Sequence, residues 1–161
     1  MRIRAATISD LVEVGACADL AMAHVDGSRN VRDVKPDGEL ASQVRRGSVH
    51  VICGWARVLG FVSFSPNADH LFVDAIAVRP SHQRQGLGSR LLAFAEDEAS
   101  RLGLRSVRLF TDGKLADNLN FFQSRGYHET SRCDEGEFSR VFYSKDIAGR
   151  TSSRFATGVS R

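Results

Sequence analysis

Residues 72–92 read FVDAIAVRPSHQRQGLGSRLL, and this stretch decides the fold. It opens with Phe72 to Val78, which are apolar except for Asp74 and predict a buried strand. Arg79-Pro80 ends that strand, because proline cannot donate to a sheet and restricts the residue before it. Apolar residues then recur at helical spacing from Leu91 to Leu102, and Glu96 falls on the opposite, polar face. The stretch therefore predicts a strand, a tight loop and a helix that begins within residues 86–88.

The loop before this helix has the features of an anion site. The first N–H groups of a helix lack partners within the helix, and its N-terminus carries about half a positive charge. Gly86 and Gly88 let the backbone approach a phosphate closely, and Arg84 adds a cation. A glycine pair also occurs in ordinary strand-to-helix turns, so the pattern alone leaves both interpretations open. It is neither GxGxxG nor a P-loop.

On both sides of this stretch, the spacing of apolar residues alternates between the period of a strand and that of a helix. The predicted strands cover residues 3–6, 49–53, 58–64, 71–78, 106–111, 127–133 and 138–145, and the predicted helices cover residues 11–23, 38–45, 88–102 and 115–125. The order is β-α-α-β-β-β-α-β-α-β-β, which indicates one mixed α/β domain without repeats. We assign residues 1–148 to this domain and predict that residues 149–161, which are small, polar and basic, form a mobile tail.

Composition excludes several classes of protein. The chain has 161 residues, 42% hydrophobic and 25% charged, which is ordinary for a soluble domain. The net charge is +3, but the basic residues do not form a continuous run, which argues against nucleic-acid binding. Cys17, Cys53 and Cys133 form neither a disulfide framework nor a metal motif, and no stretch approaches the roughly 20 apolar residues of a membrane helix. We therefore expect a cytoplasmic protein without a metal.

The run Gln83 to Gly88 resembles the acyl-CoA signature of the GNAT superfamily, [Gln/Arg]-x-x-Gly-x-[Gly/Ala]. A hydrophobic-x-Val-x-Pro strand end precedes it and a Leu-Leu helix follows it, as in that superfamily. The predicted element order resembles the GNAT fold over residues 1–146. The resemblance implies an N-acetyltransferase with acetyl-CoA as acetyl donor. It also implies an α/β fold whose mixed central sheet is splayed after the fourth strand and has helices on both faces.

The resemblance also implies where acetyl-CoA binds. The amides of residues 84–89 would hold the pyrophosphate, and the backbone of residues 76–78 would pair with the pantetheine arm like another strand. Side chains of these strand residues can still belong to the core, since the implied contact is through backbone. The cofactor-binding residues implied in this segment are Ile76, Ala77, Val78, Gln83, Arg84, Gln85, Gly86, Leu87, Gly88 and Ser89.

Acetyl transfer to an amine needs a base, because amines carry a proton at pH 7. Asp74 sits where several GNAT members place an acidic residue on the same strand, so it is the predicted catalytic base. A carboxylate on a central strand is costly unless it faces a wet cleft. The alternative is a structural carboxylate held by backbone donors. His70 and His82 are weaker candidates.

Residues 115–127 resemble a second GNAT landmark, Asn-x-x-Ala-x-x-Phe-Tyr-x-x-x-Gly-Phe. Leu115 replaces the asparagine, and Phe122 replaces the tyrosine whose hydroxyl commonly protonates the departing thiolate. Tyr127 or Tyr143 could substitute, and a thiol of pKa about 8.5 can leave without an acid. Asn118, or else Asn120, could bind the cofactor or simply face solvent. Asn118 and Phe122 complete the predicted cofactor-binding residues.

The sequence does not select the acceptor. In the superfamily the first two helices, their connecting loop and the late hairpin shape its pocket, and here the loop, residues 24–37, has mixed charge. We expect direct attack by a primary amine of a small molecule, because the loops are short. A protein N-terminus or lysine, a CoA-binding regulatory module without catalysis, and a nucleotide-binding protein are the alternatives. Trp55, in a hairpin turn, fits a surface or dimer contact, and GNAT members often form homodimers.

Overall fold

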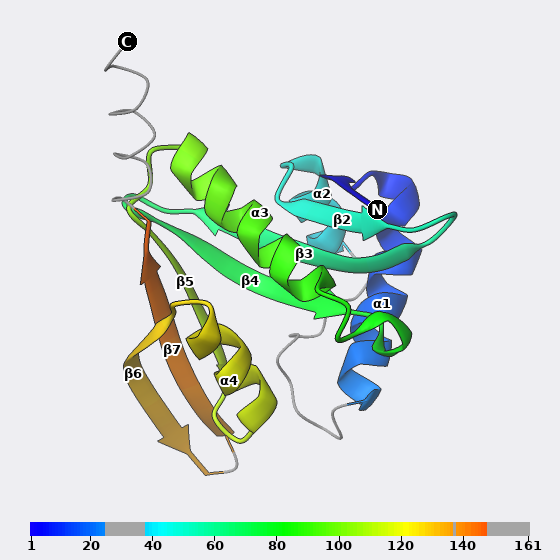
Figure 1. The fold of residues 1–161 in the computed structure, drawn as a ribbon. Helices are drawn as coiled ribbons and strands as arrows, with labels where there is room; N and C mark the ends of the chain where they lie inside the picture. Colours follow the sequence, from blue (N-terminus) through cyan, green and yellow to red (C-terminus); the bar gives the residue numbers. More distant parts are fainter. Residues whose placement is uncertain (25–37, 137, 148–161) are drawn as a thin grey trace. The chain divides into compact units, whose positions relative to one another are not determined.

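The computed structural model describes residues 1–24, 38–136 and 138–147 (Figure 1). The strands are β1 (Arg2–Ala5), β2 (Val49–Cys53), β3 (Val58–Pro66), β4 (His70–Val78), β5 (Ser106–Asp112), β6 (His128–Glu135) and β7 (Phe138–Asp146). The helices are α1 (Leu11–His24), α2 (Gly38–Arg45), α3 (Leu87–Arg101) and α4 (Ala116–Ser124), with short 3-10 helices η1 (Ile8–Asp10) and η2 (Pro80–His82). The element order confirms the prediction. Residues 25–37 of the predicted acceptor loop and the predicted tail, residues 149–161, lie outside the described residues, while His24 is the last residue of α1.

In this part of the chain the seven strands form one mixed sheet in the order β1-β2-β3-β4-β5-β7-β6. β1 to β3 pair antiparallel, as do β5, β7 and β6. β4 and β5 pair parallel, and their pairing covers three residues of each strand, His70–Phe72 against Ser106–Arg108. The α/β fold class with a mixed sheet is therefore confirmed.

The chain forms two compact units, one of residues 1–65 and 73–93, the other of residues 66–72 and 94 onward. In the first unit, α1 and α2 pack on one face of the sheet. Their buried side chains meet those of β2, β3 and β4 in one apolar cluster. The cluster includes Val14, Cys17, Leu40, Val44, Val51, Phe61 and Ala77. Burial raises the pKa of the Cys17 thiol to about 11, so Cys17 is a core residue rather than a nucleophile.

The first turns of α3 pack on the other face of this unit. Successive strand residues point to opposite faces, so Gly60 faces away from its neighbour Phe61. A Cβ atom on Gly60 would lie 2.7 Å from the carbonyl oxygen of Ala77 and 3.2 Å from Leu91 Cδ1. Only glycine allows α3 to lie this close to β3 and β4. Helices therefore cover both faces in this unit, as expected.

One prediction for α3 is wrong. The helical pattern placed Glu96 on the solvent face and Leu102 on the apolar face, yet Glu96 is 5% exposed and Leu102 is 43% exposed. In the second unit, the Glu96 carboxylate accepts hydrogen bonds from the Tyr127 hydroxyl (2.9 Å) and from Lys145 Nζ (3.1 Å). These partners compensate the buried charge. They come from β7 and the segment before β6, so the sequence of α3 alone could not reveal them.

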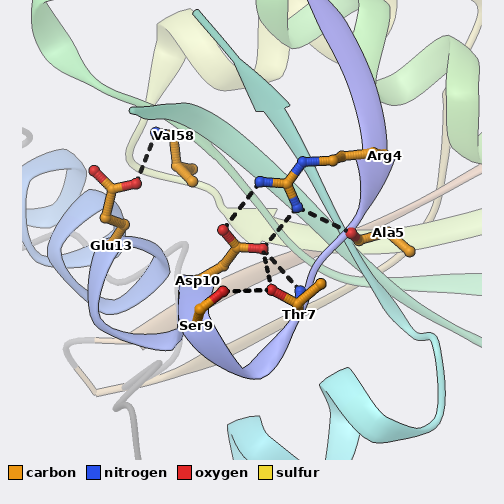
Figure 2. Close-up of polar contacts among 7 residues, drawn as sticks. All are labelled: Arg4, Ala5, Thr7, Ser9, Asp10, Glu13 and Val58. Carbon is orange, nitrogen blue, oxygen red and sulfur yellow. Dashed lines mark hydrogen bonds and ion pairs between the residues drawn. The ribbon is translucent and has the colours of Figure 1, made fainter. Parts of the chain in front are cut away.

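A second ion pair fixes the start of the chain (Figure 2). The Arg4 guanidinium donates to both carboxylate oxygens of Asp10, at 2.7 and 3.1 Å. The backbone N–H of Thr7 donates to the same carboxylate at 2.8 Å, so residues 7–10 cap the helical segment. The hydrogen bond from Arg4, supported by that from Thr7, holds the pKa of Asp10 below its usual value. β1 is thereby tied to the beginning of α1.

We expect Asp10→Asn to lower the free energy of unfolding at pH 7 by about 1–3 kcal/mol, because it weakens a charged, buried hydrogen-bond centre. The folded-state pKa of Asp10 is depressed, so its stabilisation is present above the unfolded pKa, near 3.9. It disappears as pH falls through the folded value. Urea unfolding of variant and wild type from pH 7 to pH 3 should show the difference shrinking. Glu129→Gln, which removes an exposed ion pair with Arg132, should have little effect. A pH-independent difference for Asp10→Asn would contradict the assignment.

Candidate cofactor site

The loop after β4 starts at a buried arginine. Arg79 is 8% exposed, and its Nε donates to the carbonyl oxygen of Val58 at 2.6 Å. Its Nη2 lies 4.0 Å from Glu13 Oε1, and the N–H of Val58 donates to Glu13 Oε2 at 3.0 Å (Figure 2). The end of β4 is thus bound to both α1 and β3. Sequence reasoning treated Arg79 only as a strand end, because its partners lie far away in the chain.

Gln83 closes the loop back onto the strand. Gln83 directly follows η2, and its side-chain Nε2 donates to the carbonyl oxygen of Val78 at 3.0 Å. The N–H of Arg79 donates to the carbonyl oxygen of Leu59 in β3, and in a trans peptide group the C=O points opposite to the N–H. The carbonyl of Val78, which shares this peptide group, therefore points away from β3, where Gln83 reaches it. The structure brings together these two predicted site residues.

The backbone between Gln83 and α3 is left-handed at two positions. Arg84 has φ +62° and is the one non-glycine residue with positive φ in the described part of the chain, and Gly86 has φ +83°. Left-handed residues beside right-handed ones can turn successive N–H groups toward one side, which is the arrangement of concave anion sites. α3 begins directly afterwards at Leu87. A Cβ atom on Gly86 would meet nothing within 4 Å, so the space beside this backbone is open.

The charge around the loop suits an anion. Residues 75–95 contain Arg79, Arg84 and Arg90 but no aspartate or glutamate. Arg84, Gln85 and Gly86 are exposed, and Gly88 and Ser89 are half-buried. The helix N-terminus adds its own partial positive charge. The loop can therefore bind a phosphate or pyrophosphate through backbone amides, with arginine side chains nearby.

Asp74, the predicted base, lies on β4 and is half-buried. Its Oδ2 accepts a hydrogen bond from the Ser65 hydroxyl at 2.8 Å. The two weaker candidates contact their sequence neighbours: His70 Nδ1 lies 2.8 Å from Asp69 Oδ1, and His82 Nδ1 lies 2.8 Å from Ser81 Oγ. Asp74 belongs to the first compact unit, which also contains the loop residues and most of β4.

Asn118 and Phe122 lie on α4, in the second unit. Asn118 Nδ2 is 3.5 Å from the Thr111 hydroxyl. Phe122 is 5% exposed, and its ring packs 5.9 Å from that of Tyr127 and 6.1 Å from that of Tyr143. The two tyrosines considered as substitute acids are also buried.

Both tyrosine hydroxyls are hydrogen-bonded inside this unit. That of Tyr127 donates to Glu96, and that of Tyr143 accepts from Gln123 Nε2 at 3.2 Å. An aromatic cluster therefore surrounds the position where a tyrosine was expected on α4. Phenylalanine at 122 completes this cluster without a hydroxyl of its own.

In residues 1–24, 38–136 and 138–147, no group of three or more His, Cys, Asp or Glu side chains could hold a metal ion. No helix in those ranges has the length and apolarity to cross a membrane.

Comparison with known families defines the class of protein. The model of the acetyltransferase (GNAT) family matches residues 23–127. This match covers more than half of the chain, so the chain belongs to the GNAT acetyltransferase family. Probable N-acetyltransferase 14 of Xenopus tropicalis is 32% identical over 75 residues, which are 45% of this chain and 36% of that protein. The chain thus matches about a third of the length of this relative.

Solved structures share the fold. PaiA N-acetyltransferase from Thermoplasma acidophilum, in complex with coenzyme A, superposes with a TM-score of 0.78 at 15% identity, over 90% of this chain and 98% of that one. The ribosomal-protein-S18-alanine N-acetyltransferase from Escherichia coli gives 0.72 at 19% identity, over 91% of this chain and 94% of the other. At such identities the likeness establishes the fold and leaves the acceptor open.

Proposed function

We propose that this protein transfers the acetyl group of acetyl-CoA to a primary amine. Family membership supports the reaction class. The observation that carries the proposal is the left-handed backbone at Arg84 and Gly86, directly before α3 and in a segment without carboxylates. Such a loop suits the pyrophosphate of CoA, because backbone N–H groups and the helix N-terminus converge on one anion.

The donor would bind through backbone on both sides of Gln83. The amides of residues 84–89 would hold the pyrophosphate, and the peptide groups of Ile76 and Val78 would pair with the pantetheine amides. The direction of the Val78 carbonyl, away from β3, supports this second contact. Asn118 and Phe122 are proposed to contact the donor from α4.

We expect Gln83→Ala to weaken acetyl-CoA binding about 3- to 10-fold, since one hydrogen bond that holds the loop to β4 is worth about 0.5–1.5 kcal/mol. Calorimetric titration measures the effect. Gln85→Ala is the matched control, because Gln85 is an exposed glutamine two residues further along the same loop. Its proposed contact is through the backbone amide, which alanine keeps, so the affinity should stay within about twofold of the wild type. Tighter binding by Gln83→Ala would contradict this role and would mean that the Gln83 amide competes with the donor for the Val78 carbonyl.

Asp74 is proposed as the base. It would take a proton from the acceptor ammonium, directly or through water, so that the neutral nitrogen attacks the thioester carbonyl carbon. The carbon–sulfur bond then breaks, CoA leaves as thiolate, and the acetyl group stays on nitrogen, which loses its second proton to water. The attack is direct, with no covalent enzyme intermediate. Phe122 cannot protonate the thiolate, but a thiol of pKa about 8.5 can leave as thiolate without an acid.

We propose a small-molecule amine as acceptor, with a protein N-terminus or lysine as the alternative.

One observation favours a second function, a CoA-binding regulatory module. Phe122 lacks a hydroxyl, and the hydroxyls of Tyr127 and Tyr143 are buried and engaged elsewhere. The three free cysteines fit the reducing cytoplasm expected from the sequence.

Titration of the wild-type protein with acetyl-CoA, followed by thiol-release assays with a panel of amines, tests the proposal. Binding together with amine-dependent thiol release supports an acetyltransferase. Binding without release for every amine favours the regulatory module, and absence of binding rejects the donor site.

A further inference from the structure

Arg79 is buried, whereas the other arginines and the lysines in the described part of the chain are at least partly exposed. It lies between the two parts of the proposed donor site. The strand part, residues 76–78, ends directly before Arg79, and the loop part, residues 84–89, begins five positions after it. A buried charge is costly unless partners compensate it. The partners of Arg79 therefore determine how the two parts are connected.

Two hydrogen bonds from Arg79 to β3 fix the strand part. The Arg79 Nε donates to the carbonyl oxygen of Val58 at 2.6 Å, and the Arg79 backbone N–H donates to the carbonyl oxygen of Leu59 at 2.7 Å. These two acceptors are the first residues of β3. The end of β4 therefore cannot slide along β3 without breaking both hydrogen bonds.

Glu13 of α1 supports the same contact from the other side. One of its carboxylate oxygens accepts a hydrogen bond from the N–H of Val58 at 3.0 Å (Figure 2), and the other lies 4.0 Å from Arg79 Nη2. Val58 thus accepts from the arginine and donates to the glutamate. The carboxylate also compensates the charge that Arg79 brings into the interior.

The backbone of Arg79 begins the connection to the loop part. Its carbonyl oxygen accepts a hydrogen bond from the N–H of His82 at 2.9 Å, within the turn that forms η2. Gln83 follows and donates to the Val78 carbonyl on the side away from β3. A shift of Arg79 would therefore move η2, and with it the loop part, relative to the strand part.

We infer that Arg79 is a positioning residue that sets the spacing and angle between the two parts of the donor site. This inference rests on the proposed function, because it concerns acetyl-CoA bound at that site. A ligand that spans two subsites gains affinity from their linkage only where the geometry allows it to occupy both at once. The Arg79 side chain is bound to β3 and α1, so its effect should appear only with a ligand that bridges both parts.

Fragments of the donor test this inference. S-acetylpantetheine represents the strand part of the ligand, and adenosine 3′-phosphate 5′-diphosphate represents the pyrophosphate part. Each is measured by calorimetry as a competitor of acetyl-CoA. Arg79→Met, which lacks the charge and the donors, should weaken acetyl-CoA binding at least about 10-fold, while the dissociation constant of each fragment stays within about threefold. Arg79→Lys keeps a cation that can donate to Val58 and should recover most of the affinity.

The methionine variant should fold, because Glu13 is not left buried without its partner. The Glu13 side chain is 37% exposed. Together with Val58 and Trp55, it lines a cavity of about 330 Å³, where water can solvate the carboxylate. Glu13→Ala gives a second test at this more exposed position. It removes the acceptor of the Val58 N–H and should weaken acetyl-CoA at least about threefold, again without weakening the fragments.

Arg46→Met is the matched control. Arg46 is an exposed arginine of the same unit, with a hydrogen bond to the Ser42 hydroxyl, and its loss should leave acetyl-CoA affinity unchanged. Unchanged acetyl-CoA affinity in Arg79→Met, or a fragment weakened as much as acetyl-CoA, would overturn the inference and leave the donor site in place. A wild type that binds neither acetyl-CoA nor the fragments would instead reject the proposed function.

Discussion

We expect Gly86→Glu to abolish acetyl-CoA binding, with an affinity loss of at least about 100-fold, or 2.7 kcal/mol. Gly86 has φ +83°, and the space next to it is open. A glutamate there would place a carboxylate where the proposed pyrophosphate binds. It would also strain the backbone by about 1–2 kcal/mol and turn the amides away from the anion. Hydrogen bonds to charged groups contribute about 1.5–3 kcal/mol each, so losing one or two suffices.

Gly47→Glu is the matched control for this experiment. Gly47 lies in the turn before β2, has φ +75°, and a Cβ atom there would also meet nothing within 4 Å. The two variants carry the same added charge and comparable strain, so their thermal midpoints should fall similarly. Only Gly86→Glu should lose binding in calorimetric titration. Wild-type affinity in Gly86→Glu would make the loop an ordinary strand-to-helix turn, and loss of binding in both variants would indicate a folding defect.

The second large effect concerns Asp74. If Asp74 is the base, Asp74→Asn should reduce kcat/KM about 10²- to 10⁴-fold, while calorimetry shows unchanged affinity for acetyl-CoA. The amide has nearly the same shape but cannot accept the ammonium proton. Steady-state kinetics with any amine that the wild type acetylates provides the measurement.

Ser65→Ala separates catalysis by Asp74 from its structural role. This variant removes the 2.8 Å hydrogen bond to Asp74 Oδ2 but keeps the carboxylate, so turnover should fall less than about tenfold. Full activity of Asp74→Asn with a lowered thermal midpoint would identify Asp74 as a structural carboxylate. Equal losses in the two variants would point to the hydrogen bond rather than the proton.

For both the fold and the site, the sequence predicted local features but missed contacts between residues far apart in the chain. The strand at residues 49–53 and the helix at residues 38–45 were predicted with the bounds that the structure has. The loop after β4 was identified from its glycines. The left-handed backbone at Arg84 and the hydrogen bond from Gln83 to Val78 were not, since an arginine rarely adopts positive φ and an amide side chain has many possible partners.

Local sequence patterns were sufficient to predict the elements and their order, the glycine-containing loop before α3 and the carboxylate on β4. These features depend on the spacing of apolar residues and on glycine and proline, which act over a few neighbouring residues. Tertiary structure alone decided that Glu96 is buried against Tyr127 and Lys145, that Arg79 joins Glu13 and Val58, and that a cavity lies beside Trp55. The reason is that the partners are distant in sequence, and a charge can be buried only where folding brings its compensating group.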